Sequence, residues 1–202
     1  IIMYILGITG GIGSGKSTAS NYLKNKGAVI FNADQEAKKH LKHTKILQNR
    51  IIDAFGQKVV EKNKLSISKL AETAFSSKMD QKILNGLMWP EVFMLVEKSI
   101  SEAKQNKEKL FIVDAAMIFE ANFEHMFDST LLILTRKKIR LERALKRKNL
   151  HLEQIQNRMS LQMPETEKRR KADYIINNDG TLENFHKKMD NFIKQINFKL
   201  PI

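Results

Sequence analysis

Short, nearly continuous apolar runs alternate along the chain with stretches whose apolar residues recur at helical spacing. The apolar runs fall at residues 4–8, 28–31, 110–113, 131–134 and 174–176. Helical spacing is found at about 16–26, 137–148 and 152–163, and in a C-terminal stretch that Pro201 closes. Strands that are buried on both faces are apolar throughout, and parallel strands need helical crossovers. The pattern therefore predicts an α/β fold with a five-stranded parallel sheet and helices on both faces.

The middle third of the chain has a different pattern. From about 44 to 107, apolar residues recur at helical spacing, and we expect this region to be helical and free of strands. Pro90 lies near the expected start of its longest helix, where a helix tolerates proline. The sequence thus predicts a nucleotide-binding core at 1–43 and 108–202, with a lid at about 137–163, and a helical substrate-binding insertion at 44–107.

Composition narrows the possible functions. The 202 residues include 35 Lys and Arg against 22 Asp and Glu, giving +13. This charge fits either attraction to nucleotides, coenzymes or nucleic acid, or a solvated lysine-rich surface. The absence of cysteine excludes disulfides, thiolate metal sites and a cysteine nucleophile. It also fits a reducing compartment, so we expect a cytoplasmic protein. We expect no membrane span, since no uncharged apolar run approaches the roughly 18 residues required.

Residues 10–17, GGIGSGKS, match the phosphate-binding pattern G-x-x-x-x-G-K-[ST] at every fixed position. Glycines let the backbone bring its N–H groups close to phosphate oxygens, and the following helix directs its positive end at the same anion. Lys16 can reach the β- and γ-phosphates, and the Ser17 hydroxyl can bind Mg²⁺. With a strand before it and a helix after it, the motif predicts a P-loop NTPase fold.

Two aspartates follow predicted strands. Asp34 comes after the second strand, at the edge where parallel sheets place their ligand crevice. It can act as the base that accepts a proton from an attacking hydroxyl, or it can cap the next helix. Asp114 ends the third strand, where a carboxylate can bind Mg²⁺ directly or through water, or can simply be a polar strand end.

Three arginines share one face of the predicted helix at 137–148. Arg140, Arg143 and Arg147 fall within about 60° of one another at 100° per residue. Such a face can stabilise the charge that develops during phosphoryl transfer, or it can be a solvated basic surface. The five histidines show no metal-binding spacing.

Taken together, these motifs resemble the dephospho-coenzyme A kinase family over nearly the whole chain. The matching stretches are GITGGIGSGKST at 7–18, IFNAD at 30–34, Phe55-Gly56, Leu65, VD with IFE between 113 and 120, Arg143 and Arg147, Arg158 with Gln162, ADYIINN at 172–178, and Gly180. The family has a P-loop core, a helical substrate domain and a lid. It transfers the γ-phosphate of ATP to the 3′-hydroxyl of dephospho-coenzyme A, the last step of coenzyme A synthesis.

The resemblance implies specific roles. Asp34 would be the base, Lys16 the phosphate clamp and Ser17, with Asp114, the Mg²⁺ ligands. Arg143 and Arg147 would reach over the phosphates, Arg143 as a catalytic group. The nucleotide-binding set would be Gly11, Ile12, Gly13, Ser14, Gly15, Lys16, Ser17, Thr18, Arg143, Arg147 and Asn177, with Asn177 near the adenine.

The sequence departs from the family pattern on the substrate side. Asn32 replaces an aspartate, Lys38 stands where the family often has arginine, Trp89 precedes proline in place of histidine, Ile67 replaces an arginine, and Ala116-Met117 replaces Pro-Leu. The alternatives are another P-loop small-molecule or nucleoside monophosphate kinase, and a non-catalytic nucleotide-binding protein that uses its charge on nucleic acid. We expect ATP and dephospho-coenzyme A as partners, no nucleic acid, and a monomer or weak homo-oligomer.

Overall fold

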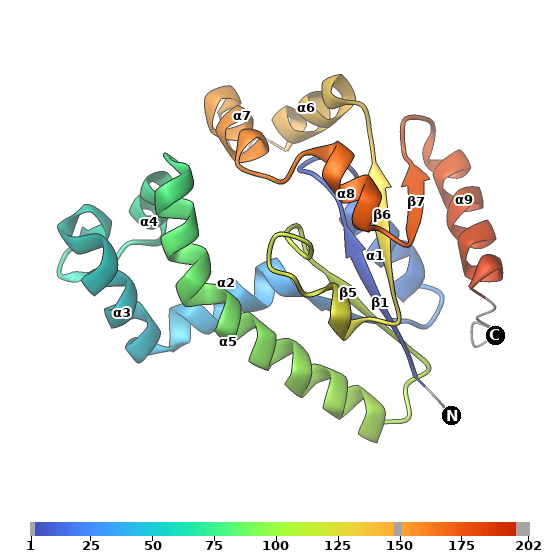
Figure 1. Ribbon diagram of the computed structural model, residues 1–202, viewed down its shortest axis with the longest axis horizontal. Helices are drawn as coiled ribbons and strands as arrows, with labels where there is room; N and C mark the ends of the chain where they lie inside the picture. Colours follow the sequence, from blue (N-terminus) through green and yellow to red (C-terminus); the bar gives the residue numbers. More distant parts are fainter. Residues whose placement is uncertain (1–2, 148–150, 197–202) are drawn as a thin grey trace.

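The computed structural model describes residues 3–147 and 151–196. Its five-stranded sheet is parallel throughout and has the order β2-β5-β1-β6-β7 (Figure 1). The strands are β1 (Tyr4–Thr9), β2 (Val29–Asn32), β5 (Leu110–Asp114), β6 (Ser129–Leu134) and β7 (Tyr174–Asn177). The predicted α/β sheet is therefore confirmed, and β1, which leads into the phosphate loop, lies at its centre.

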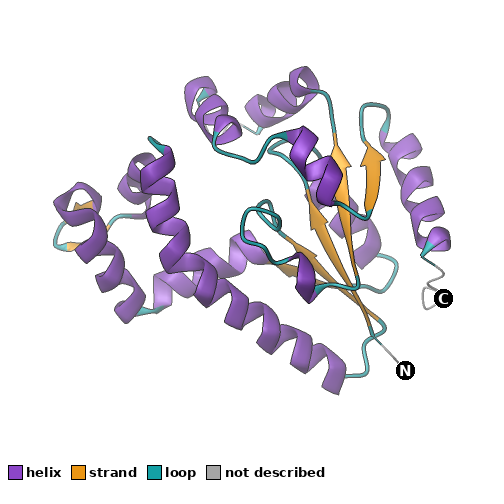
Figure 2. Ribbon diagram, in the orientation of Figure 1, coloured by secondary structure: helices purple, strands orange, loops and turns teal. Residues whose placement is uncertain are grey.

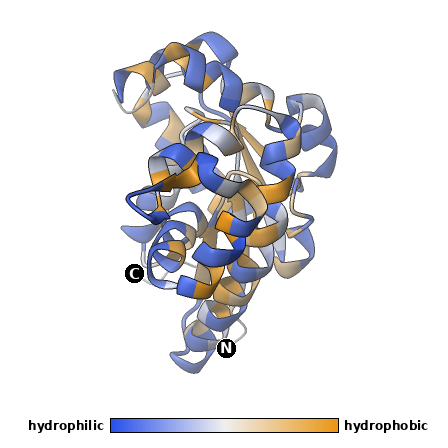
Figure 3. Ribbon diagram, turned by 90° about the vertical axis from the view of Figure 1, so that its left-hand side faces the viewer, coloured by the Kyte–Doolittle hydropathy of each residue, from blue (hydrophilic) through white to orange (hydrophobic). Residues whose placement is uncertain are grey.

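Helices cover both faces of the sheet (Figure 2). Leu6 and Ile8 of β1 pack in one cluster with helices α1 (Lys16–Lys24) and α9 (Leu182–Gln195). Ile5, which points to the opposite face, packs in a second cluster with α5 (Lys78–Gln105). Hydrophobic residues accordingly gather on the strands and hydrophilic ones on the outer helical surfaces (Figure 3). None of the helices in the described part of the chain is long and apolar enough to cross a membrane.

The region between β2 and α5 has a hydrophobic cluster of its own. It contains α2 (Ala33–His43), α3 (Lys45–Phe55), the 3₁₀ helix η1 (Gly56–Val59) and α4 (Ile67–Ala74). Residues Leu41, Leu47, Ile51, Phe55, Val59, Leu70 and Ala74 form the cluster. The expectation of a strand-free region is wrong, because β3 (Val60–Glu61) and β4 (Lys64–Leu65) form a small antiparallel hairpin. Lys62 and Asn63 at its turn both have positive φ, as a two-residue turn between twisted strands requires.

Helix α5 begins twelve residues before Pro90, so the prediction that Pro90 lies near a helix start is wrong. The Ser77 side chain accepts a hydrogen bond from the N–H of Asp80 at 3.0 Å and so caps the true start. An internal proline lacks one N–H and crowds the residue four positions earlier, here Gly86. Helix α5 changes direction along its length, as a helix with an internal proline does (Figure 1).

The predicted helices near the lid are present but shorter than expected. They are α6 (Lys137–Lys146) and α7 (Leu152–Ser160), and a further short helix, α8 (Glu165–Lys171), was not predicted. The first helix ends at Lys24, with Gly27 at φ 92° in the following turn. Lys148 and Pro201, which belonged to predicted helices, lie outside the described residues.

The separate cluster in the insertion predicts a matched pair of substitutions on α3. Ile51 is 0% exposed and Ile46 is 69% exposed. Ile51→Ala should lower the free energy of unfolding by about 2–5 kcal/mol, because it removes buried methyl groups and leaves a cavity. Ile46→Ala should change it by less than about 0.5 kcal/mol. Denaturant titrations followed by circular dichroism measure both, and equal costs would contradict the assigned packing.

Candidate active site

The phosphate loop turns between β1 and α1 through backbone conformations that favour glycine. Gly13 has φ 77° and Gly15 has φ 102°, and Gly15 stands immediately before the first residue of α1. A β-carbon on Gly13 would collide with the backbone oxygen of Arg140, and one on Gly15 would meet the Asn178 amide. The loop is therefore fixed by both conformation and close packing, and it presents the N-terminus of α1 to an anion.

Two of the N–H groups expected to line the phosphate cradle bond to protein instead. The N–H of Ser14 donates to the Gly11 carbonyl at 3.1 Å, and that of Ile12 donates to Gln162 Oε1 at 3.2 Å. The Ser14 carbonyl accepts from Thr135 Oγ1 at 3.0 Å and from the Asn178 amide at 2.8 Å. The loop is thus held in shape from β6 and β7 as well as by its own glycines.

Lys16 lies at the centre of the charged groups. Its Nζ donates to the Gly10 carbonyl at 2.9 Å. Burial lowers the pKa of Lys16, while the nearby Asp114 and Asp34 carboxylates act in the opposite direction. The three residues that the sequence assigned to phosphate clamp, base and metal ligand therefore lie close enough for their charges to interact.

Asp34 lies in the first turn of α2, exposed to solvent. The cap of that helix is Asn32, whose Oδ1 accepts from the N–H of Gln35 at 2.9 Å. The alternative that Asp34 caps the helix is therefore wrong. Asn32 also pairs in register with Asp114 at the ends of β2 and β5, which brings Asp34 to the edge where Asp114 lies.

Asp114 is 2% exposed and accepts a hydrogen bond from Ser20 Oγ at 3.0 Å. Burial raises its pKa, against the opposing effects of Lys16 and Ser20. Ionising this carboxylate thus costs folding free energy, and the cost grows as pH rises from 3.8 toward the pKa in the folded state. A cation beside it would offset that cost.

The donor set fits Mg²⁺ bound largely through phosphate and water. Ser17 is exposed at the start of α1, and Asp114 ends the neighbouring strand. Within residues 3–147 and 151–196, no three His, Cys, Asp or Glu side chains are grouped to hold a metal ion. Mg²⁺ commonly uses one or two protein groups together with substrate phosphates, so this arrangement suffices.

Arg140 and Arg143 of α6, and Arg147 just after its end, do not share one surface. The Arg140 side chain is 13% exposed, donates from Nε to the Ile12 carbonyl at 3.0 Å, and lies 3.7 Å from Glu165. Burial lowers the pKa of Arg140, and Glu165 opposes this shift. Arg140 therefore stabilises the phosphate loop by a hydrogen bond to its backbone. The alternative of a solvated basic face is wrong for this residue.

Arg143 and Arg147 instead line a pocket of about 310 Å³ beside the loop. The remaining lining residues are Gly13, Gly15, Thr18, Lys146, Asn178, Gly180 and Leu182. Arg143 Nη1 is buried and has no hydrogen-bond partner among the described residues. A pocket with three basic side chains, bounded by the phosphate loop, suits a nucleotide.

The structure does not bring Asn177 to this pocket. Asn177 is exposed, its carbonyl accepts from Lys188 Nζ at 2.7 Å, and it lines a separate hollow between β7 and α9. Adjacent residues of an extended strand point to opposite sides, and Asn178 is the one that reaches the loop.

Two residues near the loop, buried Lys168 and partly buried Glu120, were given no role from the sequence. Lys168 is 3% exposed, and its Nζ lies 2.8 Å from Glu120 Oε1 and donates to the Ala116 carbonyl at 3.1 Å. Glu120 Oε1 also accepts from the N–H of Met163 at 2.9 Å. Lys168 belongs to the basic run KRRK, which reads as a solvated helix end. The IFE match could have indicated Glu120.

Residues 4–184 match the family model described as dephospho-CoA kinase. The dephospho-CoA kinase of Fusobacterium nucleatum is 34% identical over 95% of this chain and 98% of its own length. That of Arabidopsis thaliana is 32% identical over 96% of this chain and 84% of its own. The solved dephospho-CoA kinase of Campylobacter jejuni superposes with TM-score 0.68 and 27% identity, covering 96% of this chain and 98% of that one. Shikimate kinase from Acinetobacter baumannii, at TM-score 0.54 and 16% identity, shares the fold.

The crowded loop predicts the effect of adding one methyl group. Gly13→Ala forces an unfavourable φ and a collision with the Arg140 backbone, so ATP affinity should fall by about tenfold or more. Gly86→Ala, in open space on α5, should leave the affinity unchanged. Calorimetric titration with a non-hydrolysable ATP analogue compares them. Unaltered binding by a folded Gly13→Ala protein would show that the loop does not form the nucleotide site.

Proposed function

We infer the chemistry of this site from the premise that the chain belongs to the dephospho-CoA kinase family. It is a phosphotransferase that converts dephospho-CoA to CoA, with ATP as the phosphoryl donor. We propose that the acceptor is the 3′-hydroxyl of the dephospho-CoA ribose and that transfer is direct and in line. The observation that supports this most is the grouping of Lys16 with the Asp34 and Asp114 carboxylates beside the phosphate loop.

The donor side is proposed as follows. The loop between β1 and α1 holds the ATP phosphates, and Lys16 leaves the Gly10 carbonyl to contact the β- and γ-phosphates. Arg143 and Arg147 approach the phosphates from the pocket that they line, and the unpartnered Nη1 of Arg143 supplies a donor for an oxygen. Asn178, and not Asn177, is the asparagine that lines this pocket and would contact the nucleotide.

Mg²⁺ is proposed to be held by Ser17 and Asp114, with its remaining positions on phosphate and water. Held there, the ion would neutralise part of the negative charge of the ATP phosphates. Asp114 is prepared for this role because its buried carboxylate is costly to ionise without a cation. Ser20 Oγ keeps the carboxylate oriented at the end of β5.

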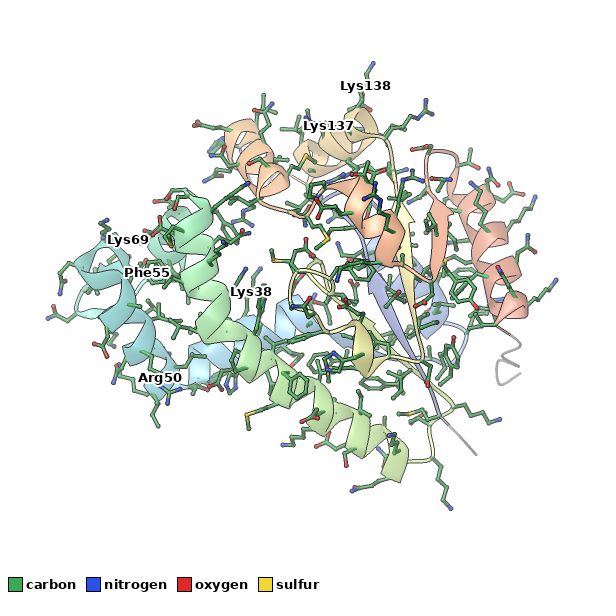
Figure 4. All side chains as sticks on the ribbon, viewed as in Figure 1. Lys38, Arg50, Phe55, Lys69, Lys137 and Lys138 are labelled. Carbon is green, nitrogen blue, oxygen red and sulfur yellow. The ribbon has the colours of Figure 1, made fainter. Side chains whose placement is uncertain are left out.

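On the acceptor side, Asp34 orients and deprotonates the ribose hydroxyl. The insertion at about 44–107 is proposed to bind the rest of dephospho-CoA. Lys38 lies four residues after Asp34 on α2, so the two side chains share one face of the helix. Lys38 is found between the insertion and the sheet (Figure 4). Lys38 can thus form an ion pair with a phosphate of dephospho-CoA while Asp34 accepts a hydrogen bond from the ribose hydroxyl. The lid, at about 137–163, excludes water and limits ATP hydrolysis.

Family membership makes the non-catalytic alternative wrong, and no structural observation favours a different kinase substrate. The expected cytoplasmic location, the monomer or weak homo-oligomer state and the lack of nucleic-acid binding stay predictions. Incubation with Mg·ATP and dephospho-CoA, followed by mass spectrometry and phosphorus NMR of the product, tests the function. We expect a phosphate on the ribose 3′-oxygen, and no product, or one phosphorylated elsewhere, would refute the proposal.

The role of Asp34 predicts a selective loss of turnover. Asp34→Asn should lower kcat by about 10²–10⁴-fold, because the base that accepts the hydroxyl proton is removed. ATP affinity should stay within about threefold, since Asp34 does not line the nucleotide pocket. Steady-state kinetics and titration with an ATP analogue measure the two quantities.

Glu36→Gln is the matched control on the same helix turn. Glu36 pairs with Lys39 at 2.6 Å on the surface, so its loss should leave kcat nearly unchanged. Full turnover by a folded Asp34→Asn protein would remove the base assignment.

A further inference from the structure

Both backbone groups of Ile12, at the tip of the phosphate loop, are bonded to the lid. Its carbonyl accepts from Arg140 Nε at 3.0 Å, and its N–H donates to Gln162 Oε1 at 3.2 Å. Arg140 lies on α6, where the lid begins, and Gln162 follows α7, where the lid returns to the core. The two ends of the lid therefore meet at one residue of the nucleotide loop.

The same end of the lid contacts the insertion. The Arg158 guanidinium, on α7, lies 4.4 Å from the centre of the Phe75 ring. Phe75 is the first residue after α4, in the turn that leads to α5. Among residues 3–147 and 151–196, no carboxylate lies within ion-pair distance of Arg158. Arg158 is partly buried, and the face of the Phe75 ring is the electrostatic partner that it has in the described part of the chain.

Arg158 lies in the last turn of α7, and Gln162 lies two residues beyond the end of that helix. One of them contacts the α4–α5 turn, and the other contacts Ile12. Figure 1 shows α7 on the side of the lid toward α4 and the start of α5. A displacement of the loop tip thus moves a segment whose other end touches the insertion.

We propose that Gln162 and Arg158 are positioning residues that link the nucleotide loop to the insertion through the end of α7, so that bound ATP orders the α4–α5 turn. The proposal rests on the proposed function, since that function assigns ATP to the loop and dephospho-CoA to the insertion. Nucleotide contacts with Arg143 and Arg147 hold α6, and through the Ile12 bonds the loop holds α7 in place. When α7 is held in place, the Arg158–Phe75 contact is populated more often, and the α4–α5 turn becomes more ordered.

The linkage also predicts that ATP and dephospho-CoA affect each other's binding. Energetic coupling between two ligands is typically about 5–150-fold in affinity and acts equally in both directions. ATP would prepare the insertion for dephospho-CoA, and dephospho-CoA would tighten ATP. Neither Gln162 nor Arg158 needs to touch a reacting atom for this effect.

Hydrogen–deuterium exchange of the backbone amides at 67–80 tests the linkage without the acceptor. A saturating non-hydrolysable ATP analogue should slow exchange there by about fivefold or more in the wild-type protein. Gln162→Leu, which cannot accept from the Ile12 N–H, should reduce the effect to less than about twofold at saturating analogue. Phe75→Leu, which removes the ring face, should do the same.

Two control substitutions separate linkage from general damage. Gln156→Leu makes the same change at an exposed position of α7 and should keep the full effect. Phe75→Tyr retains the ring and should also keep it. Thermal melting identifies any variant that fails to fold, and the Phe75 pair then decides the outcome. An analogue that leaves residues 67–80 unchanged in the wild type, or slows them equally in Gln162→Leu and Phe75→Leu, overturns the proposal.

CoA formation is measured on the same proteins. A wild-type enzyme that makes no CoA contradicts the proposed function and leaves the exchange result standing. One that makes CoA without ATP-dependent exchange at 67–80 contradicts only the linkage. The expected pattern is product formation in all variants, with the KM for dephospho-CoA raised about fivefold or more in Gln162→Leu and Phe75→Leu alone.

Discussion

The rest of the structure depends on the cost of keeping charged groups out of water next to a loop of backbone N–H groups. Lys16 is desolvated beside Asp114 and Asp34, and Asp114 is nearly inaccessible to solvent. Buried alone, the Lys16 ammonium and the Asp114 carboxylate would each be destabilising, and their proximity offsets part of that cost. A bound triphosphate with its cation would place further opposite charge beside both groups and would offset more of that cost.

The order of strands in the parallel sheet brings Lys16, Asp34 and Asp114 together. Because β1 and β5 are neighbours, and β2 lies beside β5, the phosphate loop, Asp114 and the start of α2 all meet at the carboxyl edge of the sheet. The proposed lid, which contains α6 and α7, reaches the same edge, and Arg140 and Gln162 join its two ends to the loop. The proposed donor site, acceptor base and lid thus meet because of one sheet order.

The strands, the phosphate loop and Asp114 could be predicted because each leaves a local signal: an apolar run, spaced glycines, or a carboxylate at a strand end. Several features could not. The β3–β4 hairpin is only two residues per strand, too short for a period to appear. Pro90 indicates a helix start by its own preference, and only the packing of α5 shows that the helix continues through it. Asn177 and Asn178 are adjacent, and only the alternation of side chains along the end of β7 decides which of them meets the loop. In the sequence, Lys168 cannot be told from the exposed basic residues next to it. Only the fold shows that it pairs with Glu120.

The central claim is that a carboxylate from α2 and a triphosphate on the loop approach the same acceptor hydroxyl. A crystal structure with a non-hydrolysable ATP analogue, Mg²⁺ and dephospho-CoA measures this directly. The account predicts an Asp34 carboxylate oxygen within hydrogen-bonding distance, about 2.6–3.2 Å, of the ribose 3′-oxygen, with that oxygen in line with the γ-phosphorus. An occupied ternary complex in which Asp34 faces solvent and another group contacts the hydroxyl would contradict it.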